Sequence, residues 1–248
     1  MKKPVYKKWW FWVIVIIIVG AIGSNMGKET GQQSSGDNQP GNSSSASPTP
    51  SKAPETIEYS TELTSGHYTA GIDFPAGKYD IEAIEGGGNV MSSNAFSGGI
   101  NAILGTADAN KSVGINMYEQ KYSNVSLSDG VTLSVTGVKV KISSDKASGE
   151  ALTPREQEIT ETISLESGYF VAGEDFPEGI YDINALSGGG NVISDNMFDG
   201  GLNLIMGTED ANSSLGMEMY QQSFKNAEFK EGVSLQITGV KIELVPSK

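Results

Sequence analysis

Six aspartates are the residues of this sequence best suited to chemistry or ion binding. When residues 57–143 are aligned with residues 159–245, the acids common to both segments are Asp73, Asp80, Asp108, Asp175, Asp182 and Asp210. Two carboxyl groups about 5 to 10 Å apart across a cleft can hydrolyse a glycosidic bond. Carboxylate oxygens are also ligands that Ca²⁺ prefers. These six residues are therefore the candidate ligand-binding or calcium-binding residues, and a carbohydrate-active hydrolase with paired carboxylates is one reading of the chain.

A structural role competes with both readings of these aspartates. Asn94, Asn101 and Asn110 recur in the second segment and could add carbonyl ligands, but no EF-hand spacing is present. Asp73 and Asp175 stand beside apparent turns, where a short acceptor can bind free backbone N–H groups. Two equal small domains rarely form one deep cleft. The sequence therefore predicts no catalytic residue, metal or cofactor, and a protein that is not an enzyme.

Other catalytic chemistries lack the residues that they need. The chain contains no Cys, which removes disulfides, thiolate nucleophiles and Cys-ligated zinc. The single His, His67, aligns with Tyr169, so no Ser-His pair is common to both segments, and we expect a solvated side chain in a polar turn. Residues 105–112, GTADANKS, come close to a phosphate-binding loop, but Asn110 stands where that loop requires Gly. We predict a turn there.

Two further sets of aligned residues leave alternatives open. Lys139 and Lys241 occupy equivalent positions and could either be ordinary strand lysines or form an isopeptide crosslink with an Asn. We expect the aligned aromatic residues to lie in a core rather than on a sugar-stacking surface. Exposure of two of them on one face would favour glycan binding. These aromatic pairs are Tyr79 and Tyr181, Phe96 and Phe198, and Tyr118 and Tyr220.

The residues above belong to a duplicated segment. Residues 57–143 align with 159–245 without a gap, and about half of the aligned positions are identical. A segment of this length can form its own core, so we predict two domains, 57–143 and 159–248. Residues 144–158 separate them as a linker, in which Thr153 and Pro154 either begin a short helix or belong to a bare connection.

Each segment has the signals of short strands. Residues 57–63, 131–142 and 233–244 alternate between apolar and polar side chains, as half-buried strands do. Phe74-Pro75-Ala76-Gly77 fits a type I turn, and the glycine triplets 86–88 and 188–190 fit a bend or bulge. Seven or eight short strands with regular turns predict an all-β fold: two tandem antiparallel β-sandwich domains that are jelly-roll-like.

The N-terminal residues predict a membrane anchor. Residues 1–8 form a basic tail, and residues 9–23 are an uncharged apolar run. Continued to Met26, this run is long enough for a transmembrane helix over 9–26 with a cytoplasmic N-terminus. A cleaved signal peptide is the alternative. Residues 27–56 are rich in Ser, Gly and Pro and predict a disordered linker. The residues expected at the membrane interface are Lys7, Lys8, Trp9, Trp10 and Trp12.

Charge bears on the partners of the chain. The formal net charge is −13, and the first 28 residues contain five Lys and no acid, so the remainder is more acidic still. An acidic chain repels nucleic acid, which we exclude as a partner.

The phrase AGxDFPxGxYDI, the glycines that follow it and the closing GVxLxxTGVK resemble repeat modules of membrane-anchored or secreted envelope proteins of Gram-positive bacteria, a group described as uncharacterised. The resemblance covers residues 57–143 and 159–245. It implies a β fold and an extracytoplasmic location, and it brings no catalytic residues. We therefore expect a single-pass cell-membrane protein whose duplicated modules are a non-catalytic binding or structural part of the cell envelope, with a cell-wall glycan or another envelope protein as partner.

Overall fold

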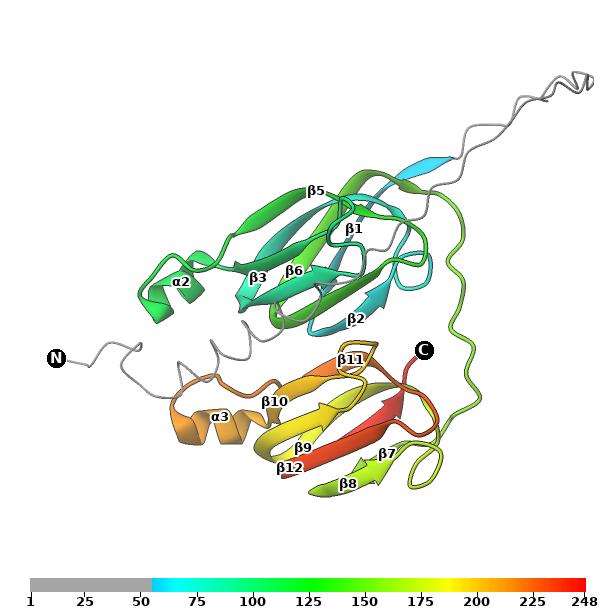
Figure 1. The fold of residues 1–248 in the computed structure, drawn as a ribbon. Helices are drawn as coiled ribbons and strands as arrows, with labels where there is room; N and C mark the ends of the chain where they lie inside the picture. The colour runs from blue at the N-terminus through cyan, green and yellow to red at the C-terminus, as the bar shows by residue number, and fades with distance from the viewer. Residues whose placement is uncertain (1–54) are drawn as a thin grey trace, which may run out of the picture. The chain divides into compact units, whose positions relative to one another are not determined.

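The computed structural model describes residues 55–248, which belong to one compact unit that is mostly β (Figure 1). Twelve strands and two short helices make up this part of the chain. The predicted all-β class is confirmed at this level, although the helices were not predicted. The predicted basic tail 1–8, the predicted transmembrane helix 9–26 and nearly all of the predicted linker 27–56 lie outside the described residues.

The same order of elements occurs twice along the chain. We call β1 to β6 the first repeat and β7 to β12 the second. The elements of the first repeat are β1 (Thr56–Leu63), β2 (Gly66–Thr69), β3 (Gly77–Ser92), β4 (Asn101–Gly105), α2 (Ala107–Val113), β5 (Lys121–Leu127) and β6 (Thr132–Ser148). Those of the second are β7 (Ile163–Leu165), β8 (Gly168–Val171), β9 (Gly179–Ser194), β10 (Asn203–Gly207), α3 (Glu209–Leu215), β11 (Ser223–Phe229) and β12 (Ser234–Pro246).

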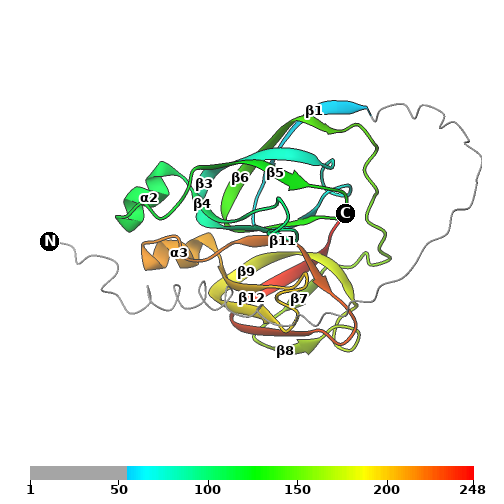
Figure 2. The same ribbon diagram turned by 45° about the horizontal axis from the view of Figure 1, so that its top comes forward.

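Two long strands form the centre of each repeat. In the first repeat, β3 and β6 pair antiparallel along most of their length and lie side by side in both views (Figures 1 and 2). The first half of β3 also pairs with β5, and its second half pairs with β4. Likewise, β6 pairs with β2 through its first half and with β1 through its second. The strands that flank the central pair therefore change halfway along it.

The change of partners coincides with a glycine corner. In β3, Tyr79 and Ile81 are buried before the corner and Val90 after it, so the buried positions switch from odd to even residue numbers. The register between β3 and β6 shifts across the glycine triplet. Gly86 and Gly137 adopt positive φ values of 70° and 74°, which glycine tolerates without strain. The predicted bulge is thus confirmed, and it keeps the same face of the sheet inward on both sides of the bend.

This inward face encloses a hydrophobic core in each repeat. One cluster of buried residues extends from Leu63 to Ala147, and a separate cluster extends from Leu165 to Leu244. In the first cluster, the rings of Phe74 and Tyr79 meet edge to face with centroids 5.5 Å apart. The Tyr79 hydroxyl donates to the Pro75 carbonyl oxygen over 2.6 Å, so the buried phenol has its hydrogen-bond partner.

Three local predictions differ from the structure. The hydrogen-bonded turn precedes Phe74 instead of following it, because the N–H groups of Ile72 and Asp73 both donate to the Thr69 carbonyl. Each repeat has six strands rather than seven or eight, because the glycine corner bends its central strands without ending them. Residues 159–165 align with the predicted strand 57–63, but a strand begins there only at Ile163. In the matching stretch of β12, Pro246 has no N–H for a longer ladder.

The predicted linker bounds 144–158 are partly wrong, because residues 144–148 belong to β6. From residue 149 to the start of β7 the chain forms no helix, so the alternative of a bare connection is confirmed there. It is nevertheless fixed at both ends. Thr153 N–H donates to the Gly71 carbonyl over 2.8 Å, while the Gln157 side-chain amide donates to the Ser247 carbonyl over 2.6 Å. Because Gly71 belongs to the first repeat and Ser247 follows β12, these bonds tie the linker to both repeats.

Candidate functional site

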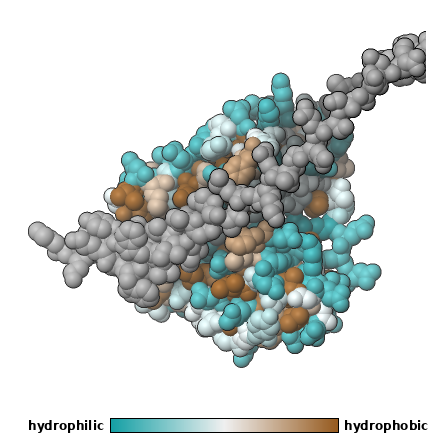
Figure 3. Space-filling view, in the orientation of Figure 1, coloured by the Kyte–Doolittle hydropathy of each residue, from teal (hydrophilic) through white to brown (hydrophobic). Residues whose placement is uncertain are grey.

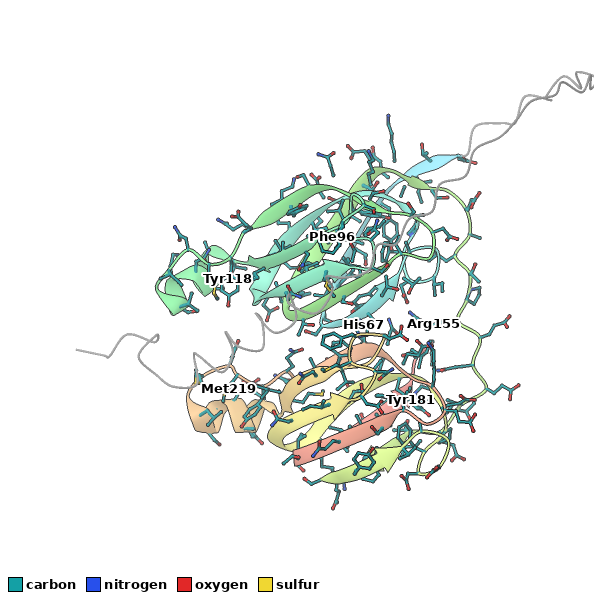
Figure 4. The ribbon with its side chains drawn as sticks, in the orientation of Figure 1. His67, Phe96, Tyr118, Arg155, Tyr181 and Met219 are labelled. Atoms are coloured by element: carbon teal, nitrogen blue, oxygen red, sulfur yellow. The ribbon has the colours of Figure 1, made fainter. Side chains whose placement is uncertain are left out.

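Asp73 and Asp175 support the turns beside which they were found in the sequence. Asp73 Oδ2 accepts a hydrogen bond from the backbone N–H of Thr69 over 2.6 Å, and Asp175 Oδ2 accepts one from Val171 over 2.8 Å. The predicted turn contacts are confirmed. Asp73 also forms a largely buried ion pair with the linker residue Arg155 at 2.5 Å (Figure 4).

Asp80 and Asp182 hold a bulge in the strands β5 and β11. Asp182 Oδ1 accepts from the backbone N–H of Asn226 over 3.1 Å, and its Oδ2 pairs with Lys225 Nζ at 2.5 Å. Asp80 makes the equivalent contact with Asn124 N–H and pairs with Lys121 at 2.7 Å. The hydrogen bond and charge of Lys121 lower the pKa of Asp80. Both carboxylates therefore stabilise strand geometry.

The last two aspartates lie exposed on the short helices. Asp108 in α2 pairs with Lys111 one helical turn later, which lowers the pKa of Asp108, and Asp210 occupies the first turn of α3. Within residues 55–248, no group of three or more His, Asp or Glu side chains is placed to hold a metal ion. The structure gives the six predicted aspartates separate local partners or positions and does not gather them into one site.

The residues from 105 to 112 form a helix start, so the predicted turn is wrong. Thr106 caps α2, its hydroxyl accepting from Ala109 N–H over 3.1 Å, and Gly114 ends the helix with a φ of 77°. The Asn110 side chain stabilises the segment that follows α2. Its Oδ1 accepts from the backbone N–H groups of Met117 and Tyr118, each over 2.8 Å.

The three aromatic pairs behave differently from one another. Tyr79 and Tyr181 are fully buried in the cores, as predicted. Tyr118 and Tyr220 are half-buried, each ring lying against two glycines of the neighbouring strands. Phe96 and Phe198 are 95% and 72% exposed, so their predicted core position is wrong. Phe96, Tyr118 and Tyr181 are labelled in Figure 4.

Hydrogen bonds fix the loops that carry the exposed phenylalanines. We call residues 92–100 and 194–202 the phenylalanine loops. Buried Ser92 closes the first, because its backbone N–H donates to the Ile100 carbonyl and its hydroxyl accepts from Ile100 N–H over 2.9 Å. The Asn94 side chain donates to the Ser126 carbonyl over 2.8 Å.

The second phenylalanine loop repeats these contacts. Ser194 closes it through Leu202, and the Asn196 side chain donates to the Glu228 carbonyl over 2.7 Å. Both repeats therefore present one phenylalanine on a fixed support. Other apolar side chains also reach the surface among hydrophilic ones (Figure 3).

Lys139 and Lys241 each have a carboxylate partner near the surface. Lys139 pairs with Glu62 at 2.6 Å and Lys241 with Glu166 at 3.1 Å. The Glu62 contact raises the pKa of Lys139, which keeps the amine protonated and non-nucleophilic. The structure thus favours ordinary strand lysines over the isopeptide crosslink.

His67 lies at a contact between the two repeats, so the prediction of a solvated His in a polar turn is wrong (Figure 4). It belongs to β2 and packs edge to face on Phe224 of β11, with ring centroids 5.0 Å apart. Its Nε2 donates to the Gly201 carbonyl over 2.7 Å, and its Nδ1 lies 2.8 Å from the Ser134 hydroxyl. Burial lowers the pKa of His67 and favours the neutral ring.

Comparisons with known proteins assign no family. No protein-family model matches the chain, and no curated protein matches it. Among solved structures, it is similar to a Cupin 2 conserved barrel domain protein from Leptotrichia buccalis, with 13% identity over 80% of this chain and 91% of that one. The TM-score is 0.21, which is too low for this similarity to establish the fold or the function of the chain. Neither helix found between residues 55 and 248 has the length and apolar character that a membrane span requires.

Proposed function

We propose that this protein is a membrane-anchored, extracytoplasmic binding protein of the bacterial cell envelope and has no catalytic activity. Residues 9–26 would span the membrane, and residues 27–56 would hold the β-rich part away from it. The apolar run and the basic residues before it support this orientation.

The β-rich part would consist of two tandem modules of the jelly-roll-like sandwich type. Two observations support this division: the element order repeats, and each repeat has a separate hydrophobic cluster. In each repeat the central strands bend at the glycine corner and keep one face inward, which brings two halves of a sheet over one core. Repeated modules of this kind suit display and binding.

The exposed phenylalanine on a fixed loop is the observation that carries a binding role. Burying a phenylalanine side chain stabilises a protein by about 1.5–3 kcal/mol, and this contribution is forgone when the ring faces water. A single exposed apolar residue needs no explanation. Here, however, Phe96 and Phe198 occupy equivalent positions, and the same serine and asparagine contacts fix both loops.

A cell-wall glycan is the ligand that these loops fit best. A phenylalanine ring offers a flat apolar face to the C–H face of a sugar ring, while neighbouring Ser97 and Asp199 offer polar groups to its hydroxyls. A neutral sugar surface also meets no repulsion from an acidic protein, unlike nucleic acid or anionic lipid. Another envelope protein would be recognised by the same exposed rings and is the competing partner.

Co-sedimentation with purified cell-wall glycan tests the proposal. We expect the full chain to bind, and the double variant Phe96→Ser/Phe198→Ser to bind at least about tenfold more weakly, which corresponds to roughly 1.4 kcal/mol. The matched control is Ile115→Ser/Met217→Ser, which removes two exposed apolar side chains at equivalent positions near the ends of α2 and α3. Equal binding by both double variants would show that the phenylalanine loops do not bind the glycan.

A protease test addresses the location separately. Protease added to intact cells should digest residues 55–248 if they lie outside the membrane. Protection that persists until the cells are lysed would contradict the extracytoplasmic location, whatever the glycan experiment shows.

A further inference from the structure

The contact between the repeats joins two different surfaces. On the first repeat it uses the outer edge of β2, which we call the socket, at Ser65, Gly66 and His67. On the second repeat it uses the bulge of β11, which we call the plug, at Phe224, Lys225 and Asn226. Lys225 pairs in parallel with Gly66 and adds β11 to the edge of the first sheet.

A few specific bonds hold plug and socket together. Lys225 N–H donates to the Ser65 carbonyl over 2.9 Å, and the Asn226 side chain donates to the His67 carbonyl over 2.8 Å. Gly66 allows this approach, because a Cβ there would lie 2.6 Å from the Lys225 Cβ. Asn226 has a φ of 57°, and this left-handed conformation belongs to the β11 bulge.

The two repeats are equivalent, so the second repeat also has a socket and the first repeat also has a plug. This second socket and this first plug have no partner within the described residues. The second repeat has a socket at Ser167, Gly168 and Tyr169 on β8. The first repeat has a plug at Tyr122, Ser123 and Asn124 on β5. Among the strands that the structure describes, β5 pairs only with β3, and β8 pairs only with β12. The first phenylalanine loop bonds to β5 at Ser126, so the unpaired part of the β5 edge is the plug at residues 122–124.

The free surfaces keep the backbone features of the contact. Gly168 aligns with Gly66, but the Phe170 ring lies 2.9 Å from where a Cβ of Gly168 would be, so this ring must turn aside before a plug can approach as closely. Asn124 has a φ of 62°, close to the value for Asn226, and β5 has the same irregularity in register as β11. Asp80 pairs with Lys121 and Asp182 with Lys225, but these lysines lie at different positions, and Ser123 stands in the free plug where Lys225 stands in the occupied one. The unpaired N–H and C=O groups of an edge strand are available to another strand.

The aromatic pair of the contact has exposed counterparts on the free surfaces. Phe224 is only 1% exposed where it packs on His67. The corresponding Tyr122 is 41% exposed and the corresponding Tyr169 is 66% exposed. Two tyrosines can form the same edge-to-face pair, and their hydroxyls can bond to polar groups at the rim.

We propose that a second copy of this chain occupies each free surface, its β5 plug binding the β8 socket as the β11 plug binds the β2 socket within one chain. Asn124 would donate to the Tyr169 carbonyl of the next copy, and Ser123 N–H to the Ser167 carbonyl. Such a contact is heterologous: one copy offers its plug and the other its socket. Further copies can therefore add at both ends of the assembly. The inference does not depend on the glycan proposal, because the variants that test it leave Phe96 and Phe198 in place.

The contact between copies should be weak in dilute solution. Within one chain, the linker holds plug and socket at an effective concentration in the millimolar range, and separate copies lack this advantage. Anchoring many copies to one membrane would restore part of it. Association should therefore be measured up to about 1 mM chain.

Mixing two complementary variants tests the proposal. Tyr169→Glu places a charge in the socket of the full chain, and Tyr122→Glu/Asn124→Gly disables its plug while keeping a residue that accepts positive φ. Sedimentation velocity in detergent should show concentration-dependent assembly of the natural sequence. Each variant alone should remain a single copy. A mixture of the two should form a 1:1 dimer and nothing larger, because one intact plug and one intact socket remain.

The control is Ile115→Ser. This variant removes an exposed apolar side chain that lies outside both plug and socket, and it should assemble like the natural sequence. Circular dichroism checks that every variant keeps its β structure. The proposal is overturned if the natural sequence stays a single copy at about 1 mM, if the variants assemble unchanged, or if the mixture gives no dimer. Dimers that stop at two copies of the natural sequence would indicate a symmetric contact and would overturn it as well.

Discussion

Replacing Gly88 with Ala should destabilise the first repeat far more than an alanine substitution at an exposed glycine. A Cβ at position 88 would lie 1.9 Å from the Thr136 carbonyl oxygen and 2.8 Å from the Gly137 carbonyl carbon. Both atoms belong to the backbone of β6, so no side chain can rotate away. The clash can be relieved only by separating β3 from β6 at the corner, where Asn89 pairs with Thr136.

The expected cost follows from this geometry. Overpacking alone costs about 1–3 kcal/mol, and disturbing a ladder hydrogen bond adds roughly 1 kcal/mol, so we expect a loss of about 3 kcal/mol. Gly114→Ala is the matched control. Its φ of 77° disfavours a side chain, but nothing lies within 4 Å of the added Cβ. The control should therefore lose only about 1 kcal/mol.

Urea unfolding of the full chain, followed by far-ultraviolet circular dichroism, measures the difference. With a slope of about 1–3 kcal/mol per molar urea, Gly88→Ala should lower the midpoint of the first repeat by roughly 1–3 M. Gly190→Ala, whose Cβ would lie 1.8 Å from the Thr238 carbonyl oxygen, should do the same to the second repeat. If Gly88→Ala costs no more than Gly114→Ala, the corner is not the tight junction described above.

Three further perturbations give distinct results. Tyr79→Phe leaves the Pro75 carbonyl without its buried donor and should cost about 1–3 kcal/mol in urea unfolding, whereas Tyr122→Phe at the surface should stay within about 0.5 kcal/mol. The pKa of His67 is lowered in the folded chain, so the contribution of His67 to stability is present above about pH 6.5 and is lost as the pH falls below that value. Urea unfolding at pH 7.5 and at pH 5.5 should show this loss of stability in the natural sequence. The loss should be smaller in His67→Gln. Millimolar Ca²⁺ should leave the thermal midpoint unchanged, because lysines and backbone N–H groups already engage Asp73, Asp80 and Asp182, and a clear rise would restore the calcium hypothesis.

Features of the fold that depend on neighbouring residues were readable from the sequence. The alternation around Tyr79 and Ile81 marked a strand with one buried face, and the glycine triplet marked a bend. The turn contacts of Asp73 and Asp175 followed from short side chains beside a turn. These three features could be predicted without knowing which strands pair, because each depends on residues close together in the sequence.

Features that depend on distant residues were not readable in the same way. Phe96 and Tyr79 are both aromatic residues repeated in the duplicate, but only the closure of the loop by Ser92 and Asn94 turns Phe96 outward. His67 appeared solvated because its partners, Gly201 and Phe224, lie far along the chain. The helix after Gly105 was not predicted, although its signals, Thr106 as an N-cap and Gly114 as a stop, lie within a few residues of each other in the sequence.

The register of β1 on β6 has a mechanical consequence. Thr56 pairs with Ser148, so the chain enters and leaves the first repeat at adjacent points of one antiparallel ladder. Tension between the preceding and following segments would pull these two strands apart from their open end and load one pair of residues at a time. Strands arranged to slide past each other would instead share the load among all pairs. Once the contacts of Thr153 and Arg155 that tie the linker to the first repeat are broken, the first repeat should unzip from this end and extend the chain as it does so.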